Sequence, residues 1–415
     1  MNLKHIIFNT SAQILGRVVS GFFSFLSLLM IAKALGSEYF GEYTKAVTII
    51  SFLYIICDFG LNTIFLRDYH KNWQEKFNYF WGARLLMSIL LILMATVAIF
   101  TTSQFLPGFP FLVVLATTIS GISLIGQSTS LSIQAIFQQT KRLDKTALAQ
   151  IAGAILNTIL LAVFFTQIKT NPQSGVLLTS AILSISAIMT AIVSANLLKS
   201  LGKFSPSINL NFMKKIWTRS IPIGLTLIFN IIYFRIDTFI LSTARPAAEV
   251  GIYGLAYKFF EVTLILPTFI MNSLYPDLLK MKNDRQKFWQ KSRQILISLG
   301  IISLILLMVG WVSAPLLKLV QRDFAMSVPL LRILLTGLPL FYLTSPLMWV
   351  LIIWKKQWQL SAIYALSLVF NFAANLIFIP IYGASAAAYV TIATEGVVLL
   401  SETIIIIKLL WKKTN

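Results

Sequence analysis

Residues 293–317, RQILISLGIISLILLMVGWVSAPLL, show the pattern that decides the fold class of this chain. After Arg293 the stretch carries no charged side chain, and crossing the apolar core of a bilayer takes about 20 apolar residues. Comparable stretches recur along the whole chain. They predict an all-α protein with about twelve transmembrane helices, at 9–33, 42–66, 79–101, 110–136, 146–168, 175–198, 219–243, 251–275, 293–317, 327–354, 357–380 and 384–410.

The overall composition leads to the same fold class. The chain is 57% hydrophobic and 12% charged, with a mean hydropathy of +0.81, whereas a soluble domain carries about 25% charged residues. In lipid the backbone polar groups must be satisfied within helices. The breaks between predicted spans are short, and the longest runs from Lys199 to Thr218, so we expect no extramembrane catalytic domain.

The net charge of +20 is distributed unevenly along the chain. An even number of spans places both termini on one side, and most Lys and Arg residues fall in segments on that side. This is the positive-inside pattern, so we predict an N-in, C-in orientation. The basic segments are interpreted as anchors at lipid headgroups, and no nucleic-acid partner is expected.

The sole cysteine, Cys57, allows neither an intramolecular disulfide nor a cysteine metal site; no metal or cofactor is predicted. The first span is expected to be retained rather than cleaved as a signal peptide.

The longest break divides the chain into an N-terminal six-helix half (1–200), a cytoplasmic connecting segment (201–218) and a C-terminal six-helix half (219–415). A short similarity supports a repeat, because residues 35–46 (LGSEYFGEYTKA) and 248–258 (AEVGIYGLAYK) both place Gly-x-Tyr after an acidic residue. Halves of six spans share one orientation, and transporters of this plan bind substrate between their halves and open alternately to each side. Gly and Tyr are also frequent at membrane interfaces, which leaves the repeat open.

Ten charged residues stand out inside the predicted spans. Each costs about 2.5–3.5 kcal/mol at mid-bilayer, so we expect them to line a cavity rather than face lipid. They are Arg17, Asp58, Arg84, Arg235, Asp237, Lys258, Glu261, Arg332, Glu395 and Glu402.

The bases and the acids of this set suit different tasks. Guanidinium and ammonium groups bind phosphate oxygens, so the candidate sites for an anionic substrate are Arg17, Arg84, Arg235, Lys258 and Arg332. A cavity carboxylate can carry a proton or Na⁺, which makes Asp58, Asp237, Glu261 and Glu395 the candidates for ion coupling. Structural pairing stays an alternative. Lys258 and Glu261 are three residues apart on one helix face, and Arg17, Asp58 and Arg84 are predicted to lie near one inner mouth. No catalytic residues are assigned.

With its first outer loop (36–43, GSEYFGEY), Asp58-Phe59-Gly60-Leu61 ahead of Arg67, and the 380–387 turn (PIYGASAA), the chain resembles Wzx-type polysaccharide and O-antigen flippases. These belong to the multidrug/oligosaccharidyl-lipid/polysaccharide (MOP) exporter superfamily, which includes the MATE exporters. The resemblance implies translocation of undecaprenyl-diphosphate-linked oligosaccharide across a bacterial inner membrane, driven by H⁺ or Na⁺ antiport. Polysaccharide polymerase or chain-length proteins stay open as further partners, and the resemblance fixes no residue roles.

Three alternative assignments fit the sequence less well. A MATE-like exporter of small amphipathic cations predicts a cavity of net negative charge, whereas five bases here face five acids within the spans. A major-facilitator transporter would carry a glycine-containing basic loop after the second span, which residues 66–71 do not provide. An integral-membrane glycan polymerase or ligase would need a long outer loop, and none is long enough here. We therefore expect a transporter rather than an enzyme.

Overall fold

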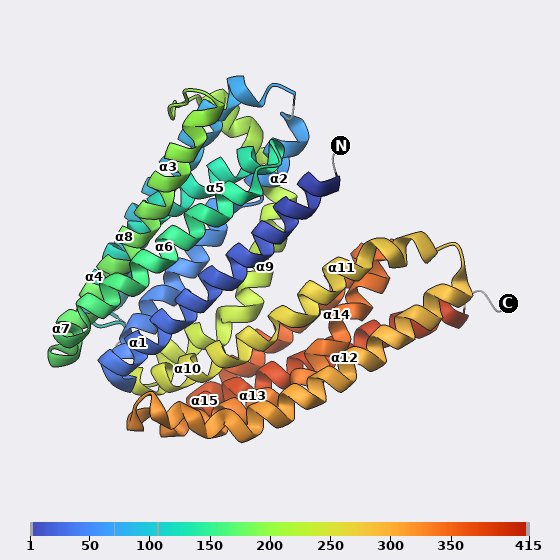
Figure 1. Cartoon of the computed structure of the whole chain (residues 1–415). Helices are drawn as coiled ribbons and strands as arrows, with labels where there is room; N and C mark the ends of the chain where they lie inside the picture. The colour runs from blue at the N-terminus through green and yellow to red at the C-terminus, as the bar shows by residue number, and fades with distance from the viewer. Residues whose placement is uncertain (1–2, 70, 106–107, 412–415) are drawn as a thin grey trace. The chain divides into compact units, whose positions relative to one another are not determined.

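A computed structural model describes residues 3–69, 71–105 and 108–411, which form helices joined by short loops, with no strand among them. It divides into two compact units, Met1–Phe234 and Arg235–Asn415. Figure 1 shows the helices along the chain. The helices before the connection to the second half are α1 (Leu3–Asp58), α2 (Leu61–Asp68), α3 (Trp73–Ser103), α4 (Phe111–Gly121), α5 (Ser123–Gln139), α6 (Leu143–Val163), α7 (Phe165–Thr170), α8 (Pro172–Leu198) and the 3₁₀ turn η1 (Lys199–Leu201).

The remaining helices begin at residue 210, and the boundary between the two units falls inside the first of them, between Phe234 and Arg235. They are α9 (Leu210–Ala244), α10 (Ala247–Thr263), α11 (Ile265–Met281), α12 (Arg285–Ser313), η2 (Ala314–Leu319), η3 (Arg322–Met326), α13 (Ser327–Thr336), α14 (Leu338–Ile353) and α15 (Gln357–Trp411).

Nine helical stretches in the described part of the chain are long and apolar enough to cross a membrane. Two of them, within Leu15–Asp68 and Gln357–Leu410, are 54 residues long and contain a glycine with left-handed backbone, Gly36 (φ 71°) and Gly383 (φ 62°). In α15 the chain folds back on itself there, because Asn371 Nδ2 donates to Thr394 Oγ1 at 3.0 Å across 23 residues, which would span about 34 Å in a straight helix. The fold class is therefore all-α and multi-span, while the count of twelve and the N-in orientation stay predictions.

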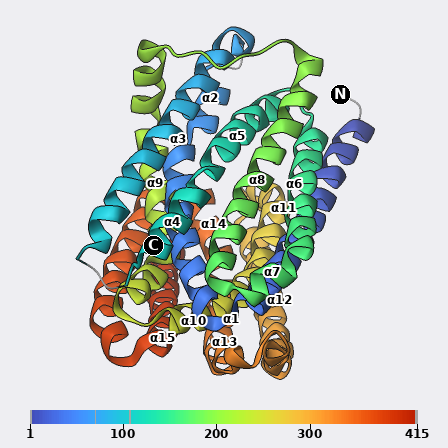
Figure 2. The same ribbon diagram turned by 90° about the vertical axis from the view of Figure 1, so that its left-hand side faces the viewer.

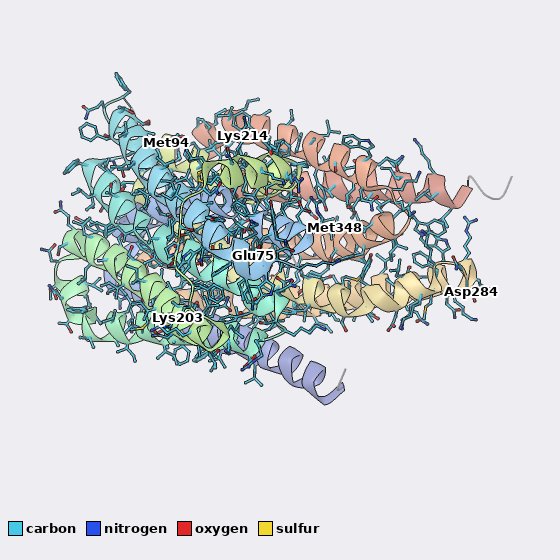
Figure 3. All side chains as sticks on the ribbon, turned by 90° about the horizontal axis from the view of Figure 1, so that it is seen from above. Glu75, Met94, Lys203, Lys214, Asp284 and Met348 are labelled. Atoms are coloured by element: carbon cyan, nitrogen blue, oxygen red, sulfur yellow. The ribbon has the colours of Figure 1, made fainter. Side chains whose placement is uncertain are left out.

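Apolar side chains cover the outer faces of the helices. Met94 on α3, labelled in Figure 3, is 67% exposed, and Val312 and Ile377 are 79% and 58% exposed. Contiguous exposed apolar surface on this scale marks a lipid-facing or partner-facing surface. These faces fit the hydrocarbon of a bilayer.

In the first unit, α1 packs on α6, and α8 packs on α5 and α6 (Figures 1 and 2). Small residues permit the close approach: a Cβ on Gly16 of α1 would overlap the side chain of Ala147 on α6. Ser27 and Thr158 join the same two helices through their hydroxyls at 2.9 Å. Small residues and hydroxyl pairs are the usual means of helix association in membranes, where no hydrophobic effect acts between helices.

In the second unit, α14 packs on α12 and α15, and α10 packs on α13. Two hydroxyls bond across these helices to backbone carbonyls: Tyr342 donates to Thr263 O at 2.6 Å and Ser327 donates to Ile252 O at 2.8 Å. Phe260 and Phe341 meet edge to face at 5.4 Å. These contacts hold α10 against the α13–α14 region and so fix the position of the charged residues that α10 carries.

The connecting segment is shorter than predicted and bonded to the first unit. The expected range was 201–218, but α9 already begins at Leu210. Figure 2 shows the preceding segment, which includes Lys203 (labelled in Figure 3), running from the end of α8 to the start of α9. The backbone N–H groups of Ser205 and Ser207 donate to Asn78 at 3.1 and 3.0 Å. Asn78 thus holds this segment on α3. Helix α9 begins at Leu210 because Asn209 caps it: the side-chain oxygen of Asn209 accepts from Phe212 N at 2.9 Å, which satisfies an otherwise free N–H of the first turn.

Candidate functional site

Arg84 is the centre of a buried polar network in the first unit. Its side chain is 0% exposed and projects from α3. One terminal nitrogen donates to Asn62 Oδ1 at 2.8 Å and to Ser132 Oγ at 3.3 Å, and the other lies 3.4 Å from Asp58 Oδ1. The guanidinium also lies 4.8 Å from the centroid of the Phe80 ring. Helices α2, α3 and α5 and the end of α1 therefore meet on one charge, which no longer has a free face toward a substrate.

A break between α1 and α2 positions Asp58 for this network. Phe59 and Gly60 both have positive φ, 43° and 69°, which ends α1 at Asp58 and lets α2 begin at Leu61. Glycine tolerates such a left-handed backbone without a Cβ penalty. A Cβ on Gly60 would overlap the side chain of Ile223 on α9, and one on Gly224 would overlap the ring of Phe59. The two glycines allow α9 to contact the break directly.

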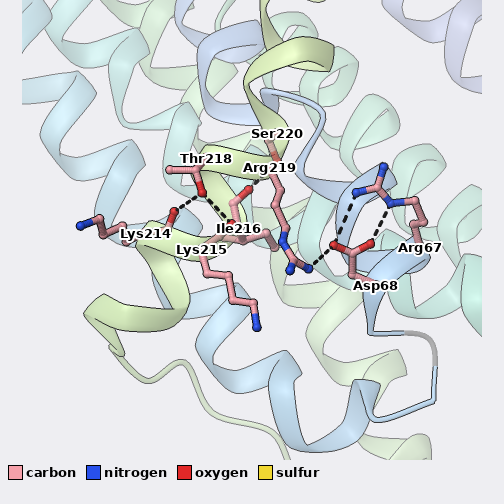
Figure 4. Close-up of polar contacts among 8 residues, drawn as sticks. All are labelled: Arg67, Asp68, Lys214, Lys215, Ile216, Thr218, Arg219 and Ser220. Atoms are coloured by element: carbon pink, nitrogen blue, oxygen red, sulfur yellow. Dashed lines mark hydrogen bonds and ion pairs between the residues drawn. The ribbon is translucent and has the colours of Figure 1, made fainter.

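Asp68 joins the end of α2 to α9. Its carboxylate receives Arg67 Nε at 2.7 Å and a terminal nitrogen of Arg219 at 2.7 Å (Figure 4). The two arginine side chains are 61% and 45% exposed, so solvent and salt screen the pairs. Sequence reasoning treated both arginines as headgroup anchors and did not identify Asp68 as their partner.

Arg17 and Arg332 lie apart from these networks. Arg17 is exposed on α1 and makes no ion pair with any side chain that the structure describes. Of the three residues predicted to share one mouth, the structure therefore brings together Asp58 and Arg84 but not Arg17. Arg332 on α13 donates to Trp311 O at 3.4 Å and lies 5.3 Å from the centroid of the Trp311 ring.

In the second unit, two bases share one carboxylate. Glu261 accepts from Arg235 at 2.9 Å and from Lys258 at 2.8 Å, and Arg235 also lies 5.8 Å from the centroid of the Tyr257 ring. The ion pair predicted from the spacing of Lys258 and Glu261 is present. The triad has one uncompensated positive charge, and the side chains of Lys258 and Glu261 are 38% and 39% exposed. The group is therefore open to an anion from outside.

Asp237 is oriented away from that triad. It is 3% exposed and accepts from the Tyr253 hydroxyl, from Thr238 N at 2.6 Å and from the Thr391 hydroxyl at 3.5 Å. The Thr238 hydroxyl donates as well, at 3.3 Å, and all of these donors are neutral. Arg235, two residues earlier, pairs with Glu261 instead.

A row of buried polar groups continues from Asp237 along the two limbs of α15. Asn375 donates to Asn371 Oδ1 at 2.9 Å, and Asn371 in turn donates to Thr394 at 3.0 Å. Glu395, the residue after Thr394, accepts from the Thr344 hydroxyl of α14. The two asparagines were missed from the sequence, although their spacing of four residues within an apolar run places them on one helix face.

The 380–387 turn packs on the start of α10. Glu249 accepts from Arg245 Nε at 2.8 Å and from the backbone N–H of Ala384 at 2.7 Å. A Cβ on Gly383 would overlap the Glu249 carboxylate. Glu249, the acidic residue of the second Gly-x-Tyr segment, therefore anchors the 380–387 turn within α15. No group of three or more His, Cys, Asp or Glu side chains within the described ranges could hold a metal ion.

Comparisons with known sequences place these features in context. The sequence model of the polysaccharide biosynthesis protein family matches residues 3–282. The succinoglycan biosynthesis transport protein ExoT of Rhizobium meliloti (strain 1021) is 20% identical over 348 residues, which is 80% of this chain and 66% of that protein. The chain thus spans just under two thirds of the length of that relative.

Solved structures share the fold. The lipid II flippase MurJ in an inward closed conformation superposes with a TM-score of 0.78 at 17% identity, covering 96% of this chain and 87% of that one. An inward-facing multidrug resistance MATE family transporter of the MOP superfamily gives 0.75 at 15% identity, covering 99% and 100%. The predicted MATE/MOP-like fold is confirmed.

Proposed function

Because the chain belongs to the polysaccharide biosynthesis protein family, we propose that it is a flippase that moves undecaprenyl-diphosphate-linked oligosaccharide from the cytoplasmic to the periplasmic leaflet of a bacterial inner membrane. The names of ExoT and MurJ, a polysaccharide transport protein and a lipid flippase, support this substrate class. Alternating access with both termini in the cytoplasm is part of the proposal.

The observation that carries the proposal is the triad of Arg235, Lys258 and Glu261. Two bases bonded to one carboxylate retain a single positive charge, and this charge is partly exposed within apolar helices. A diphosphate passing the triad would take Lys258 and Arg235 as donors while Glu261 keeps them in place when the site is empty. Charge-assisted bonds of this type are about twice as strong as neutral ones.

The other candidate bases have different surroundings. Arg84 is buried and donates to Asn62, Ser132 and Asp58 through its two terminal nitrogens, and only its Nε lacks a partner among the described residues, which favours a positioning role in the conformation described. Arg17 and Arg332 keep donors that could guide an anionic headgroup. We propose substrate contact first for Arg235 and Lys258, and as a later step for the other three.

Among the candidate acids, Asp237 has the surroundings that best suit ion coupling. Asp58 and Glu261 are already neutralised by bases. Asp237 is buried, and its hydrogen bonds come from neutral donors. No described base lies within ion-pair distance of its carboxylate, so a proton or Na⁺ would compensate the negative charge of Asp237. Carboxylate oxygens suit hard cations as well as protons. Glu395, on the same row, is the second candidate.

The deciding experiment analyses lipid-linked oligosaccharide in a strain that lacks this protein. We expect undecaprenyl-diphosphate oligosaccharide to accumulate on the cytoplasmic leaflet and the surface glycan to be lost. Unchanged lipid-linked pools with increased sensitivity to cationic dyes would indicate a MATE-like drug exporter instead. Full-length lipid-linked units on the outer leaflet without chain growth would indicate a polymerase or ligase.

The triad is tested in the same strain by complementation. Lys258→Ala removes one donor of the triad, and loss of a charged hydrogen bond of about 1.5–3 kcal/mol should reduce export about tenfold or more. Lys280→Ala is the matched control, since Lys280 also pairs with a carboxylate three residues away, Asp277 at 3.7 Å, but is 80% exposed. Equal export by both variants at equal protein level would remove the triad from the substrate path.

A further inference from the structure

Glu402 is a buried acid to which the proposed function gives no role. It lies on the second limb of α15 and is 0% exposed. Both of its carboxyl oxygens lack a hydrogen-bond partner among the residues that the structure describes. In this respect it differs from the other acids, because Asp58, Glu261 and Asp237 all accept bonds from named donors.

The groups that act on Glu402 do not stabilise a negative charge. Glu395, seven residues earlier and on the same face of the helix, is the charged side chain that interacts with it electrostatically, and it has the same sign. Tyr364 on the first limb of α15 interacts with both carboxyls. Arg285 of α12 donates to the carbonyls of Leu409 and Leu410, at 3.3 and 2.9 Å, and not to Glu402.

A buried carboxylate needs a donor, a cation or a proton, because removing an unpaired charge from water is very costly. The described neighbours supply neither donor nor cation to Glu402. Where two carboxyls interact and only one of them accepts a hydrogen bond from a donor, the bonded carboxyl favours the ionised form and the other favours the protonated form. Glu395 accepts from Thr344 and suits the ionised state, whereas Glu402 suits the neutral acid.

We propose that Glu402 is a proton-binding site of the second unit: it holds a proton in this conformation and releases it to water when the second limb of α15 becomes hydrated. On release the O–H bond electrons stay on the carboxylate and the proton passes to water, so no other reactant is needed. A role of this proton in driving transport rests on the proposed function, but its binding does not.

The first test is infrared difference spectroscopy of the full-length chain in lipid nanodiscs at neutral pH. Wild type minus Glu402→Gln should contain the carbonyl stretch of a protonated carboxylic acid, and glutamine preserves the shape of the neutral side chain. Glu249→Gln is the matched control, because Glu249 is ion-paired with Arg245 and its removal should leave that band unchanged. A wild-type spectrum without the band, or a band that Glu402→Gln leaves in place, would overturn the assignment.

A second test needs no variant and so does not depend on folding. Dicyclohexylcarbodiimide reacts with protonated carboxyls in apolar surroundings, and peptide mapping locates the adduct. We expect Glu402 to be labelled about tenfold or more above Glu249 at neutral pH, since burial favours its neutral form, and the label to fall as the pH rises. Equal labelling of the two would overturn the proposal. Labelled Glu402 in a protein whose deletion leaves lipid-linked glycan unchanged would refute the flippase and keep the proton site.

Discussion

Replacing Arg84 tests whether its buried network supports the first unit. Arg84→Met keeps most of the side-chain volume but removes the donors of Asn62 and Asp58. An amide oxygen left without a donor costs about 1–3 kcal/mol. The Asp58 pair adds about 0.5–1 kcal/mol, since its carboxylate is 30% exposed and partly screened. We therefore expect a loss of about 3 kcal/mol in the free energy of unfolding.

The assay is equilibrium unfolding of the purified protein in mixed micelles, with Arg17→Met as the matched control. Arg17 is exposed and has no ion pair among the side chains described, so its replacement should change stability by at most about 0.5 kcal/mol. Adding Asp58→Asn to Arg84→Met should recover about 1 kcal/mol, because the unpaired carboxylate disappears. The reasoning is refuted if Arg84→Met loses no more stability than Arg17→Met.

Three further predictions concern backbone, ion pairing and pH. Gly60→Ala should lower the free energy of unfolding by at least about 2 kcal/mol, because the added Cβ strains the left-handed backbone and overlaps α9. Gly21→Ala is the control: nothing lies within 4 Å of its added carbon, so it should raise the free energy of unfolding by up to about 1 kcal/mol. Thermal melting compares the two variants, and equal shifts in melting temperature would contradict the strain at Gly60. Arg219→Ala should lower the free energy of unfolding by less than about 1 kcal/mol, because its ion pair with Asp68 is exposed and screened by salt. A loss of stability that does not depend on salt concentration would argue against an exposed ion pair as its cause. The side chain of Lys287 donates to Asp284, which is labelled in Figure 3, and holds the pKa of that carboxyl below its usual value. Asp284 therefore stabilises the start of α12 at neutral pH, and this stabilisation is lost as the pH falls through the lowered pKa of Asp284. Amide exchange at the start of α12 should be faster in Asp284→Ala than in the wild type at neutral pH, and the two proteins should exchange equally in acid.

The features that could be predicted from the sequence are those set by neighbours along one helix. Apolar stretches identified the membrane-spanning character, and a spacing of three residues identified the pair of Lys258 and Glu261. Depth along the spans brought Asp58 and Arg84 together correctly. These inferences need only helix geometry and the cost of a charge in lipid.

The remaining features depend on partners far away in the chain. Asn62 and Ser132 complete the Arg84 network, but nothing in a single span tells which hydroxyl or amide will face an arginine of another helix. The segment before α9 is bonded to Asn78, which lies 127 residues before Ser205. Asp237 meets Thr391 across 154 residues. Such pairings are settled by tertiary packing, which local pattern does not encode.

The contacts between α9 and the break at Gly60 also set an order of events during synthesis. Arg219, the partner of Asp68, lies 151 residues later in the chain. At a synthesis rate of about 5–20 residues per second, roughly 8–30 s of translation separate the two residues. By the end of that interval the first six predicted spans have been synthesised, whereas Phe59 and Asn78 gain their partners only when the chain beyond residue 200 follows. A chain truncated near residue 200 should therefore be a substrate for membrane quality control, although every one of its predicted spans is complete.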